Sequence, residues 1–553
     1  MNSISKSFQQ LADRYLTGLF DFWPCQASFL GLHEYDARQP DLSASAIAGR
    51  LDMVRSQAGA LAALNPAQLT AEEAFDYRLL EAALELELYQ WEAERGFRLN
   101  PMWYLRAIEF SNFLVRNYEP LQERLRGVIG YLRNTPAILT AARENLAPHL
   151  ARPLIEVSLQ MYKGLRAFYD TDLQAVASLA DGSVLDELQA ARQTASQAVD
   201  QFIQALEGQY LPAANEDYAI GVENYRRMLH AGELVDLPIE TLLKIGERDL
   251  ARNLAGAREQ GRQIDPTLSL QEVAQLLQCD HPSKAELIPA TRDLLEAIRQ
   301  FLIDRHIVSV PSEVRAQVEE TPTYMRWAFA MMDTPGPFET VGTEAYFYVT
   351  PPDPNWSAEQ QEEWLGSFNH SFLQNLVVHE AYPGHYIQYL HVNYRLHSRL
   401  RQALILVLSY AFSEGWAHYA EEMMLDAGLG DQNPRLRFAQ FQDALVRNCR
   451  YICSIRMHTQ GMSVDEATRF FMENALMGET PSRQEALRGT FDPGYLYYTL
   501  GKLMIVKLRD DLKKREGTDF DLHAFHDRLL SYGTPPLPLL RAEMLGADSG
   551  EIL

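Results

Sequence analysis

His379-Glu380-Ala381-Tyr382-Pro383-Gly384-His385 is the stretch that most strongly constrains the fold. A second polar cluster begins 28 residues further on, with the sequence Ser413-Glu414-Gly415-Trp416-Ala417-His418-Tyr419-Ala420-Glu421-Glu422. Six of the 14 histidines lie between residues 370 and 418. A catalytic zinc ion takes three imidazole or carboxylate ligands, leaves one position for water and needs a nearby carboxylate as proton acceptor. The two clusters contain all of these groups, so the sequence predicts a zinc site.

The spacing of His379 and His385 requires a break in the helix between them. Zinc ligands in the common H-E-x-x-H motif are four residues apart and share one helix face, whereas these two are six apart. On a continuous helix the second imidazole would point roughly 120° away from the first, given 3.6 residues per turn. Proline removes a helical hydrogen bond and glycine tolerates unusual backbone angles. We therefore expect Pro383 and Gly384 to widen or end the helix and to bring His385 back towards His379.

Motifs along most of the chain resemble one family. Residues 379–385 and 413–421 match the H-E-A-x-P-G-H and S-E-G-W-A-x-Y-x-E signature of a large, mainly bacterial family, domain of unknown function 885, whose members are regarded as zincin-like metallopeptidases. Residues 30–36 are similar to the family's opening. Near the end, its E-x-x-R and P-G…Y-x-x-G pattern fits Glu485, Arg488, Pro493-Gly494, Tyr498 and Gly501. Departures at Gly489, Tyr495 and residues 454–458 fall where substrate would be gripped, so they bear on specificity rather than on the metal.

The resemblance implies a third zinc ligand, Glu414, beside His379 and His385, and two His with one Glu is a known catalytic zinc set. Glu421 and His418 share a helix face with Glu414, because they lie three or four residues apart in succession, so any of the three could face the ion. Glu421 suits the role of holding a ligand imidazole in its tautomer. His418 is either a substitute ligand or a core histidine, and we favour the second.

The catalytic roles follow from these assignments. Zinc lowers the pKa of its bound water towards neutrality, and Glu380 would accept the proton and pass it to the leaving amine. The developing oxyanion needs further hydrogen-bond donors, and the resemblance implies His458 and Tyr498 for this role. Arg488 is the candidate for binding a substrate carboxylate, since a guanidinium can hold one bidentately.

Apolar periodicity predicts helices through most of the chain. One begins at Thr70 with a capping box to Glu73, and others are expected at 117–148, 152–173, 183–207, 239–262, 282–304, 399–427 and 434–459. Short strands are predicted at 308–319 and at Ala345–Val349. We therefore expect an N-terminal helical region, residues 1–310, which covers a cleft, and a metal-binding catalytic region, residues 311–553.

The expected fold class is mainly α: a large two-lobed helical zincin-like metallopeptidase fold with a small β-sheet beside the active-site helix. The free edge of such a sheet can bind an extended peptide through main-chain hydrogen bonds. Tyr346, 33 residues before His379, lies in the strand to which we assign this substrate-binding role. A hairpin that only packs on helices is the alternative.

The composition narrows the partners and the location. A net charge of -24 argues against binding to nucleic acid or to an anionic membrane, since both need clustered positive charge. The four cysteines form no C-x-x-C pair and no disulfide framework. The N-terminus has no apolar signal-like segment, and the longest apolar run, residues 403–412, is too short to cross a bilayer. We therefore expect a cytoplasmic protein, whose oligomeric state the sequence does not indicate.

Zinc-dependent hydrolysis of short peptides or related amides is the function that we expect. Exopeptidase action of the carboxypeptidase kind is favoured over aminopeptidase action, because Arg488, and also Lys502, could neutralise a substrate's C-terminal carboxylate. Oligopeptidase action is the next choice. The alternative is a non-catalytic helical protein that binds a metal or a peptide. Glu380 favours the hydrolase, since a structural metal site needs no base beside its ligands.

Overall fold

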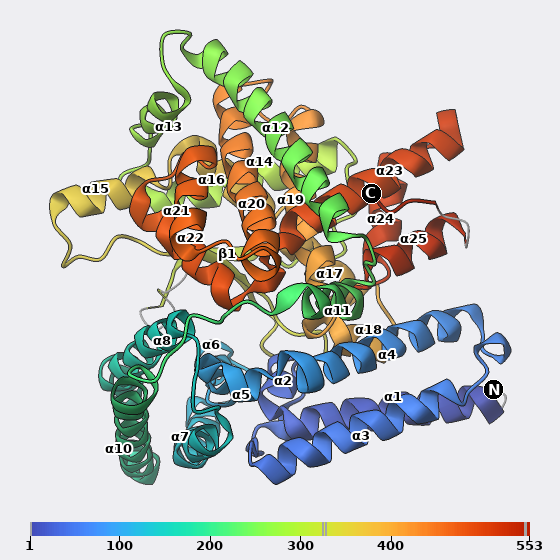
Figure 1. Ribbon diagram of the computed structural model, residues 1–553. Helices are drawn as coiled ribbons and strands as arrows, with labels where there is room; N and C mark the ends of the chain where they lie inside the picture. The colour runs from blue at the N-terminus through green and yellow to red at the C-terminus, as the bar shows by residue number, and fades with distance from the viewer. Residues whose placement is uncertain (1–2, 323–325, 327–328, 547–549) are drawn as a thin grey trace. The chain divides into compact units, whose positions relative to one another are not determined.

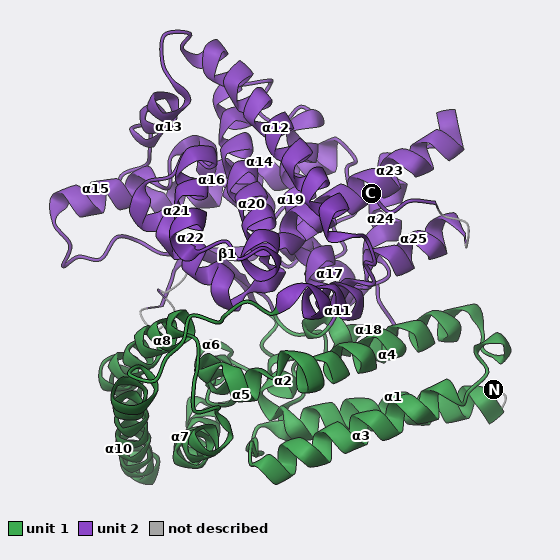
Figure 2. Ribbon diagram, viewed as in Figure 1, with its two compact units in different colours: residues 1–220, 335–343, 398–407 green, residues 221–334, 344–397, 408–553 purple. Residues whose placement is uncertain are grey.

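The computed structural model describes residues 3–322, 326, 329–546 and 550–553. This part of the chain is mainly helical and contains one three-stranded sheet, as expected (Figure 1). It divides into two compact units (Figure 2). Unit 1 comprises residues 1–220, 335–343 and 398–407, and unit 2 comprises residues 221–334, 344–397 and 408–553.

Unit 1 is built from helices. They are α1 (Ser3–Phe22), α2 (Pro24–Phe29), α3 (Ala44–Ala62), α4 (Ala71–Tyr89), α5 (Gly96–Leu99), α6 (Ser111–Val115), α7 (Leu121–Asn145), α8 (Arg152–Asp170), α9 (Asp172–Ala177), α10 (Gly182–Ala205) and α18 (Arg399–Ala403). The predicted capping box is present, because Thr70 and Glu73 satisfy each other's backbone N–H groups at the start of α4. Helix α4 packs against α3 and α1, and Phe75, Leu79 and Leu80 are buried there.

Two late segments complete unit 1. Residues 335–343 are held by His33, whose Nδ1 lies 3.1 Å from Asp36 and whose Nε2 lies 2.8 Å from Glu339. The His33 ring stacks on Tyr118 at 3.5 Å. Residues 398–407 are held by the ion pair between Arg401 and Asp76, at 2.5 Å.

Unit 2 contains the sheet and the C-terminal helices. Its elements are α11 (Gly221–Glu233), α12 (Ile239–Ile264), α13 (Leu270–Gln278), α14 (Leu287–Asp304), β1 (Ala316–Glu320), β2 (Ala330–Asp333), β3 (Ala345–Val349), α15 (Ala358–Gly366), α16 (His370–Glu380), α17 (His385–Tyr394), α19 (Tyr410–Asp426), α20 (Pro434–Thr459), α21 (Val464–Asn474), α22 (Glu479–Phe491), α23 (Tyr497–Glu516), α24 (Leu522–Leu530) and α25 (Leu537–Leu545). Helix α20 is central: it packs against α12, α16, α21, α22 and α23. Helix α19 packs against α16 and α23.

Glycines bring α19 and α23 unusually close. A Cβ at Gly501 would lie 1.8 Å from the carbonyl oxygen of Ala411, and a Cβ at Gly415 would lie 2.5 Å from Gly501. The two backbones therefore touch, and this crossing fixes α23 against the helix that carries Glu414.

The sheet has the order β1-β3-β2, with β1 parallel and β2 antiparallel to β3. Strand β3 is thus the central strand, paired on both sides over Tyr346–Val349. The prediction that the strand of Tyr346 offers a free edge to a peptide is wrong, because its main-chain groups are already used. The Tyr346 ring stacks on Tyr348. Strand β1 packs on α14, and α14 in turn packs on the metal-motif helix α16.

Two further predictions differ from the structure. The helix expected over 399–427 is interrupted: α18 ends at Ala403, and α19 begins after Ser409, which has φ of +42°. The two compact units meet in sequence at residue 220 rather than at 310, so α11 to α14 belong to unit 2. None of the described helices is both long and apolar enough to cross a membrane.

Candidate metal centre

The metal motif is a helix, a tight turn and a second helix. Helix α16 ends at Glu380 and α17 begins at His385, so the expected break at Pro383 and Gly384 is present. Gly384 is required at this turn: a Cβ there would lie 1.7 Å from the carbonyl oxygen of His379. The turn therefore brings the second imidazole back beside the first, with ring centroids 4.9 Å apart and planes at 87°.

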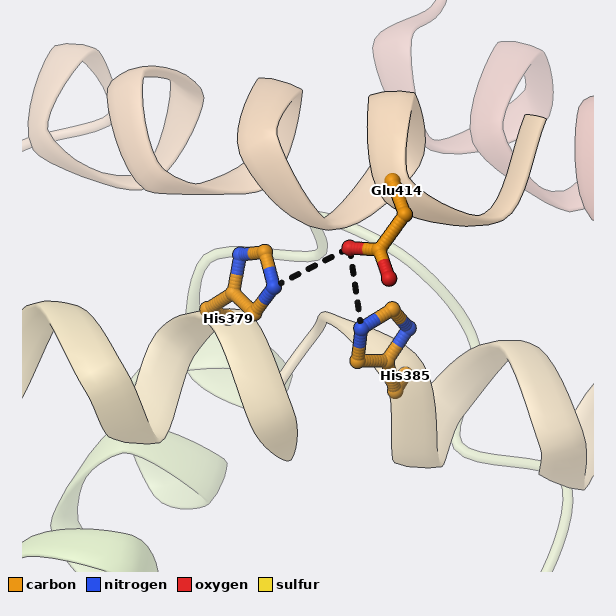
Figure 3. Close-up of side chains that lie close together, drawn as sticks. All are labelled: His379, His385 and Glu414. Atoms are coloured by element: carbon orange, nitrogen blue, oxygen red, sulfur yellow. Dashed lines mark ion pairs between the residues drawn. The ribbon is translucent and has the colours of Figure 1, made fainter. Parts of the chain in front are cut away.

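His379, His385 and Glu414 converge, as Figure 3 shows. One potential ligand atom from each lies within 4.8 Å of the other two. Oε2 of Glu414 is 3.4 Å from Nε2 of His379 and 3.5 Å from Nε2 of His385. Two imidazole nitrogens and one carboxylate oxygen at these distances form a donor set that suits zinc.

The burial and ionisation of the Glu414 carboxylate are suited to binding a cation between the three residues. Its Oε2 is buried and accepts no hydrogen bond within the described part of the chain, and a buried polar atom without a partner is unusual. Burial alone would raise the pKa of Glu414, but the neighbouring His385 and His379 hold it well below its usual range. The carboxylate is therefore ionised and available to a metal.

Glu421 organises the surroundings of His379, as predicted. Its Oε1 accepts from Nδ1 of His379 at 2.7 Å, which leaves Nε2 of that ring facing Glu414. Burial lowers the pKa of His379, but the carboxylates of Glu414 and Glu421 outweigh it and raise the pKa to about 10. Arg447 lies 3.0 Å from Glu421 and is itself paired with Asp443 at 2.5 Å.

His418 lies outside the triad. Its Nδ1 donates to Oε2 of Glu421 at 3.1 Å, and its ring is fully buried. Burial, followed by the charge of Lys502, lowers the pKa of His418 to about 3, so the imidazole is neutral. These contacts agree with the favoured interpretation of His418 as a core histidine.

Glu380 is half-buried at the C-terminal end of α16. Within the described residues its carboxylate makes no hydrogen bond and no ion pair, unlike those of Glu414 and Glu421. Glu380 thus directly follows His379, and no described residue competes for its carboxylate.

Two tyrosines and an arginine lie together near the triad. The hydroxyl groups of Tyr498 and Tyr410 are 3.0 Å apart, and Arg488 donates to the Tyr410 hydroxyl at 3.4 Å. Burial, followed by the charge of Glu414, raises the pKa of both phenols. Arg488 is also paired with Asp492 at 2.9 Å. The structure therefore brings Tyr498 and Arg488 together and adds Tyr410.

The sequence prediction did not single out Tyr410 or Arg447. The available signal for Tyr410 was its position four residues before Glu414, which places both on one face of α19. No comparable signal marks Arg447, whose guanidinium lies 5.6 Å from the Tyr498 ring.

His458 is placed differently from Tyr498. Its buried Nε2 donates to the carbonyl of Gly489 at 2.7 Å, and its ring stacks on Tyr225. Burial lowers the pKa of His458 to about 4. These contacts lie between α20, α22 and α11, so the structure does not group His458 with the triad, and its role as an oxyanion donor stays a prediction.

The N-terminus of α19 is held by Glu233 at the end of α11. Its carboxylate accepts from the backbone N–H of Ala411 at 2.8 Å and from the hydroxyl of Ser409 at 2.6 Å. Burial raises the pKa of Glu233 to about 7 despite these hydrogen bonds. A buried carboxylate thus caps the helix that carries Tyr410 and Glu414.

Two solved structures share this fold. One is a putative lipoprotein of unknown function from Shewanella oneidensis, 25% identical over 97% of this chain and 99% of that chain, with a TM-score of 0.81. The other is a putative lipoprotein from Colwellia psychrerythraea, 17% identical over 97% of this chain and 98% of that chain, with a TM-score of 0.80. No curated protein matches this chain.

These neighbours overturn the predicted cytoplasmic location. Both are described as putative lipoproteins. The absence of an apolar N-terminal segment was the physical basis of that prediction, and it does not outweigh the likeness along nearly the whole chain.

A family model also matches nearly the whole chain. A model of a family described as bacterial protein of unknown function (DUF885) matches residues 24–544, which includes His379, Glu414, Arg488 and Tyr498. The resemblance that the motifs indicated is thereby confirmed, and the chain belongs to the DUF885 family.

Proposed function

We propose that this chain is a zinc-dependent hydrolase of short peptides or related amides, with a zincin-like catalytic unit. The observation that carries the proposal is the convergence of His379, His385 and Glu414 within 4.8 Å. Glu380 supports a catalytic rather than a structural site, because it adjoins the first ligand and has no partner among the described residues. The lipoprotein names of the two relatives support activity outside the cytoplasm.

His379, His385 and Glu414 would hold the zinc ion. When bound, zinc would act as a Lewis acid that polarises the substrate's carbonyl group and lowers the pKa of water. Glu380 would accept the proton of the attacking water and deliver it to the leaving amine. The Tyr498 hydroxyl would donate a hydrogen bond to the developing oxyanion.

Arg488 supports substrates with a free C-terminus. Arg488 contacts Asp492 through Nε and one terminal nitrogen, and both nitrogens reach the same carboxylate oxygen. A guanidinium has five N–H donors, so donors are left for a substrate carboxylate. This supports carboxypeptidase-like trimming, with oligopeptidase action as the next choice.

The test combines metal analysis with peptide digestion. The purified protein should hold about one zinc per chain and cleave short peptides. Glu414→Ala should lose the zinc and the activity, whereas His418→Ala should keep the metal. Glu380→Gln should keep zinc and lose roughly 10²- to 10⁴-fold in hydrolysis. Full zinc retention by Glu414→Ala, or unchanged turnover by Glu380→Gln, would contradict the proposal.

The ends of the substrate form a second arm of the same experiment. One short peptide is compared in free, N-acetylated and C-amidated forms. Amidation should slow cleavage if Arg488 binds the terminal carboxylate, and Arg488→Lys should reduce the difference, because lysine lacks the planar fork. Cleavage that acetylation blocks and amidation does not would contradict this choice of end.

A further inference from the structure

A cavity with a volume of about 470 Å³ lies in unit 2 between α12, α19 and α23. Small-molecule sites usually have a few hundred Å³ or more. None of its lining residues belongs to the candidate metal centre. Tyr419 and Met423, which line it, are five and nine positions after Glu414 on α19, which turns them roughly 140° and 180° from the metal-facing side. The cavity is therefore separate from the metal triad.

Lys502 faces this cavity and not the triad. The sequence suggested Lys502 as a second cation for a substrate carboxylate. In the structure its side chain is 1% exposed, lines the cavity, and places Nζ 2.5 Å from Glu422. The close crossing of Gly415 and Gly501 accounts for this position, because Lys502 directly follows Gly501 and is pressed against α19. Lys502 is thus left without a role at the metal centre.

The cavity carries an excess of positive charge. Its lining includes four cations and three carboxylates: Arg248, Arg252, Lys502, Arg509, Asp249, Glu422 and Asp426. Two of these residues form ion pairs with residues that do not line the cavity: Arg509 with Asp510, and Asp426 with Arg437. Asp510 and Arg437 carry opposite charges, so they leave the charge balance of the lining unchanged. A local excess of cations is notable in a chain of net charge -24.

Arg248 supplies the available cation. Glu422 is already shared by Arg252, at 2.6 and 3.0 Å, and by Lys502. Asp249 also pairs with Arg252, at 3.1 Å. Arg248 is exposed at the cavity and makes no hydrogen bond or ion pair with its side chain in the described part of the chain. An arginine in this state can bind a carboxylate bidentately.

The rest of the lining is apolar. Ile245, Met423, Leu503 and Val506 contribute aliphatic or thioether side chains, and Tyr419 contributes its ring. We propose that this cavity binds a carboxylate that carries a short apolar body, with the carboxylate on Arg248 and the body among the apolar side chains. A short fatty acid and the terminal residue of a peptide with an apolar side chain share this chemistry. The site does not depend on the metal or on hydrolysis.

Hexanoate is the first probe, measured by ligand-observed NMR titration of the full chain with and without zinc. We expect binding with a Kd of about 1 mM or tighter, since so small a ligand has few atoms to contribute. Hexylamine should bind at least tenfold more weakly, because its ammonium meets an excess of cations. Hexanol should also bind more weakly than hexanoate, because it cannot form the charged pair.

Two variants test the location. Arg248→Gln should raise the Kd for hexanoate roughly tenfold, the loss expected for a charge-assisted pair. Val506→Trp should abolish binding by filling the cavity, with circular dichroism to confirm the fold. The matched control is Arg258→Gln, an exposed arginine on the same helix that does not line the cavity, and it should bind as the parent does.

A final arm separates the two sources of the carboxylate. N-acetyl-leucine is titrated beside hexanoate, and the tighter ligand indicates whether a peptide terminus or a fatty acid is the better fit. Leucine amide, which lacks the carboxylate, should not bind. Equal affinity for hexanoate and hexylamine, or unchanged hexanoate affinity in Arg248→Gln or in Val506→Trp, would overturn the proposal.

Discussion

Glu421 connects three side chains beside the candidate metal centre. Its fully buried carboxylate accepts hydrogen bonds from Nδ1 of His379 and Nδ1 of His418 and forms an ion pair with Arg447. Three donors of this kind hold the pKa of Glu421 well below its usual range, although burial alone would raise it. The carboxylate stays charged, and the charge keeps the His379 ring turned towards Glu414.

Glu421→Gln should therefore weaken zinc binding without removing a ligand. Loss of a partner behind a ligand imidazole typically costs about 10- to 100-fold in metal affinity. Competition with a chelator measures the zinc Kd, and the exposed Glu473→Gln on α21 serves as a control for a generic loss of one carboxylate. Zinc affinity equal to that of the parent would show that the ring is held by other contacts.

Tyr410 is predicted to support Tyr498. Its hydroxyl lies between that of Tyr498 and the guanidinium of Arg488. If the proposed hydrolysis is correct, Tyr410→Phe should lower kcat about tenfold with little change in zinc content, because one hydrogen bond that orients the donor is lost. Tyr498→Phe should have the larger effect. A Tyr410→Phe enzyme with parental kcat would exclude this role.

The sequence predicted the three converging residues better than the residues that surround them. His379, His385 and Glu414 belong to compact motifs, and the Pro383-Gly384 break could be derived from helix geometry. Arg447 and Tyr410 could not be assigned in the same way, because their contacts depend on how α19, α20 and α23 cross. The prediction that Lys502 binds a substrate carboxylate is wrong for the same reason. The direction of its side chain depends on the crossing of α19 and α23, which hydrophobic periodicity does not determine.

At the scale of the element, the crossing of α19 and α23 is the feature most sensitive to change. Gly501→Ala would place a methyl group 1.8 Å from the carbonyl oxygen of Ala411, which is backbone and cannot turn aside. Overpacking of this kind costs roughly 1–3 kcal/mol, against a gain of up to ~1 kcal/mol in helix propensity. The free energy of unfolding should fall.

Gly164→Ala is the matched control for this prediction. Gly164 also lies within a helix, α8, but nothing lies within 4 Å of the position its Cβ would take. This substitution should leave the stability unchanged or raise it by up to ~1 kcal/mol. Denaturant titration of both variants measures the difference, and equal effects at the two glycines would contradict the backbone contact.

Element boundaries show where periodicity succeeds and where it fails. Helix α20 covers the predicted 434–459, and β3 covers the predicted Ala345–Val349. The break before α19 was missed because residues 404–408 are apolar and look like a continuing helix. Helix α18 nevertheless ends at Ala403, and α19 begins anew after Ser409, which is held in the left-handed region and bonded to Glu233, 176 residues earlier in the chain.

At the scale of the whole molecule, the two units are interleaved in sequence. Unit 1 takes residues 335–343 and 398–407 from the middle of the unit 2 sequence. The boundary expected at 310 followed the change from helical to strand-like patterns, which marks a change of element rather than a change of unit. Hydrophobic patterns indicate where helices form but not which helices pack together, so this interleaving could not be predicted.

The segment 335–343 is predicted to depend on one ionised histidine. Glu339 accepts the backbone N–H groups of Thr340, Val341 and Gly342 through Oε1 and binds His33 through Oε2. Burial lowers the pKa of His33, but Asp36 and Glu339 outweigh it and raise the pKa to about 9. A raised histidine pKa stabilises the folded state fully below pH 6.5, and this contribution is lost as the pH rises through 9.

Hydrogen exchange of the full chain tests this dependence. The opening free energy of the amides of Phe338, Val341 and Gly342 should fall by roughly 1–3 kcal/mol between pH 6.5 and 9, after correction for the intrinsic exchange rate. His33→Ala should lower it at pH 6.5 and remove most of the pH dependence. His230→Ala, a change to an exposed histidine of unit 2, is the control. If the same amides stay protected in His33→Ala, the segment is held by backbone packing against Leu30 and Gly31 instead.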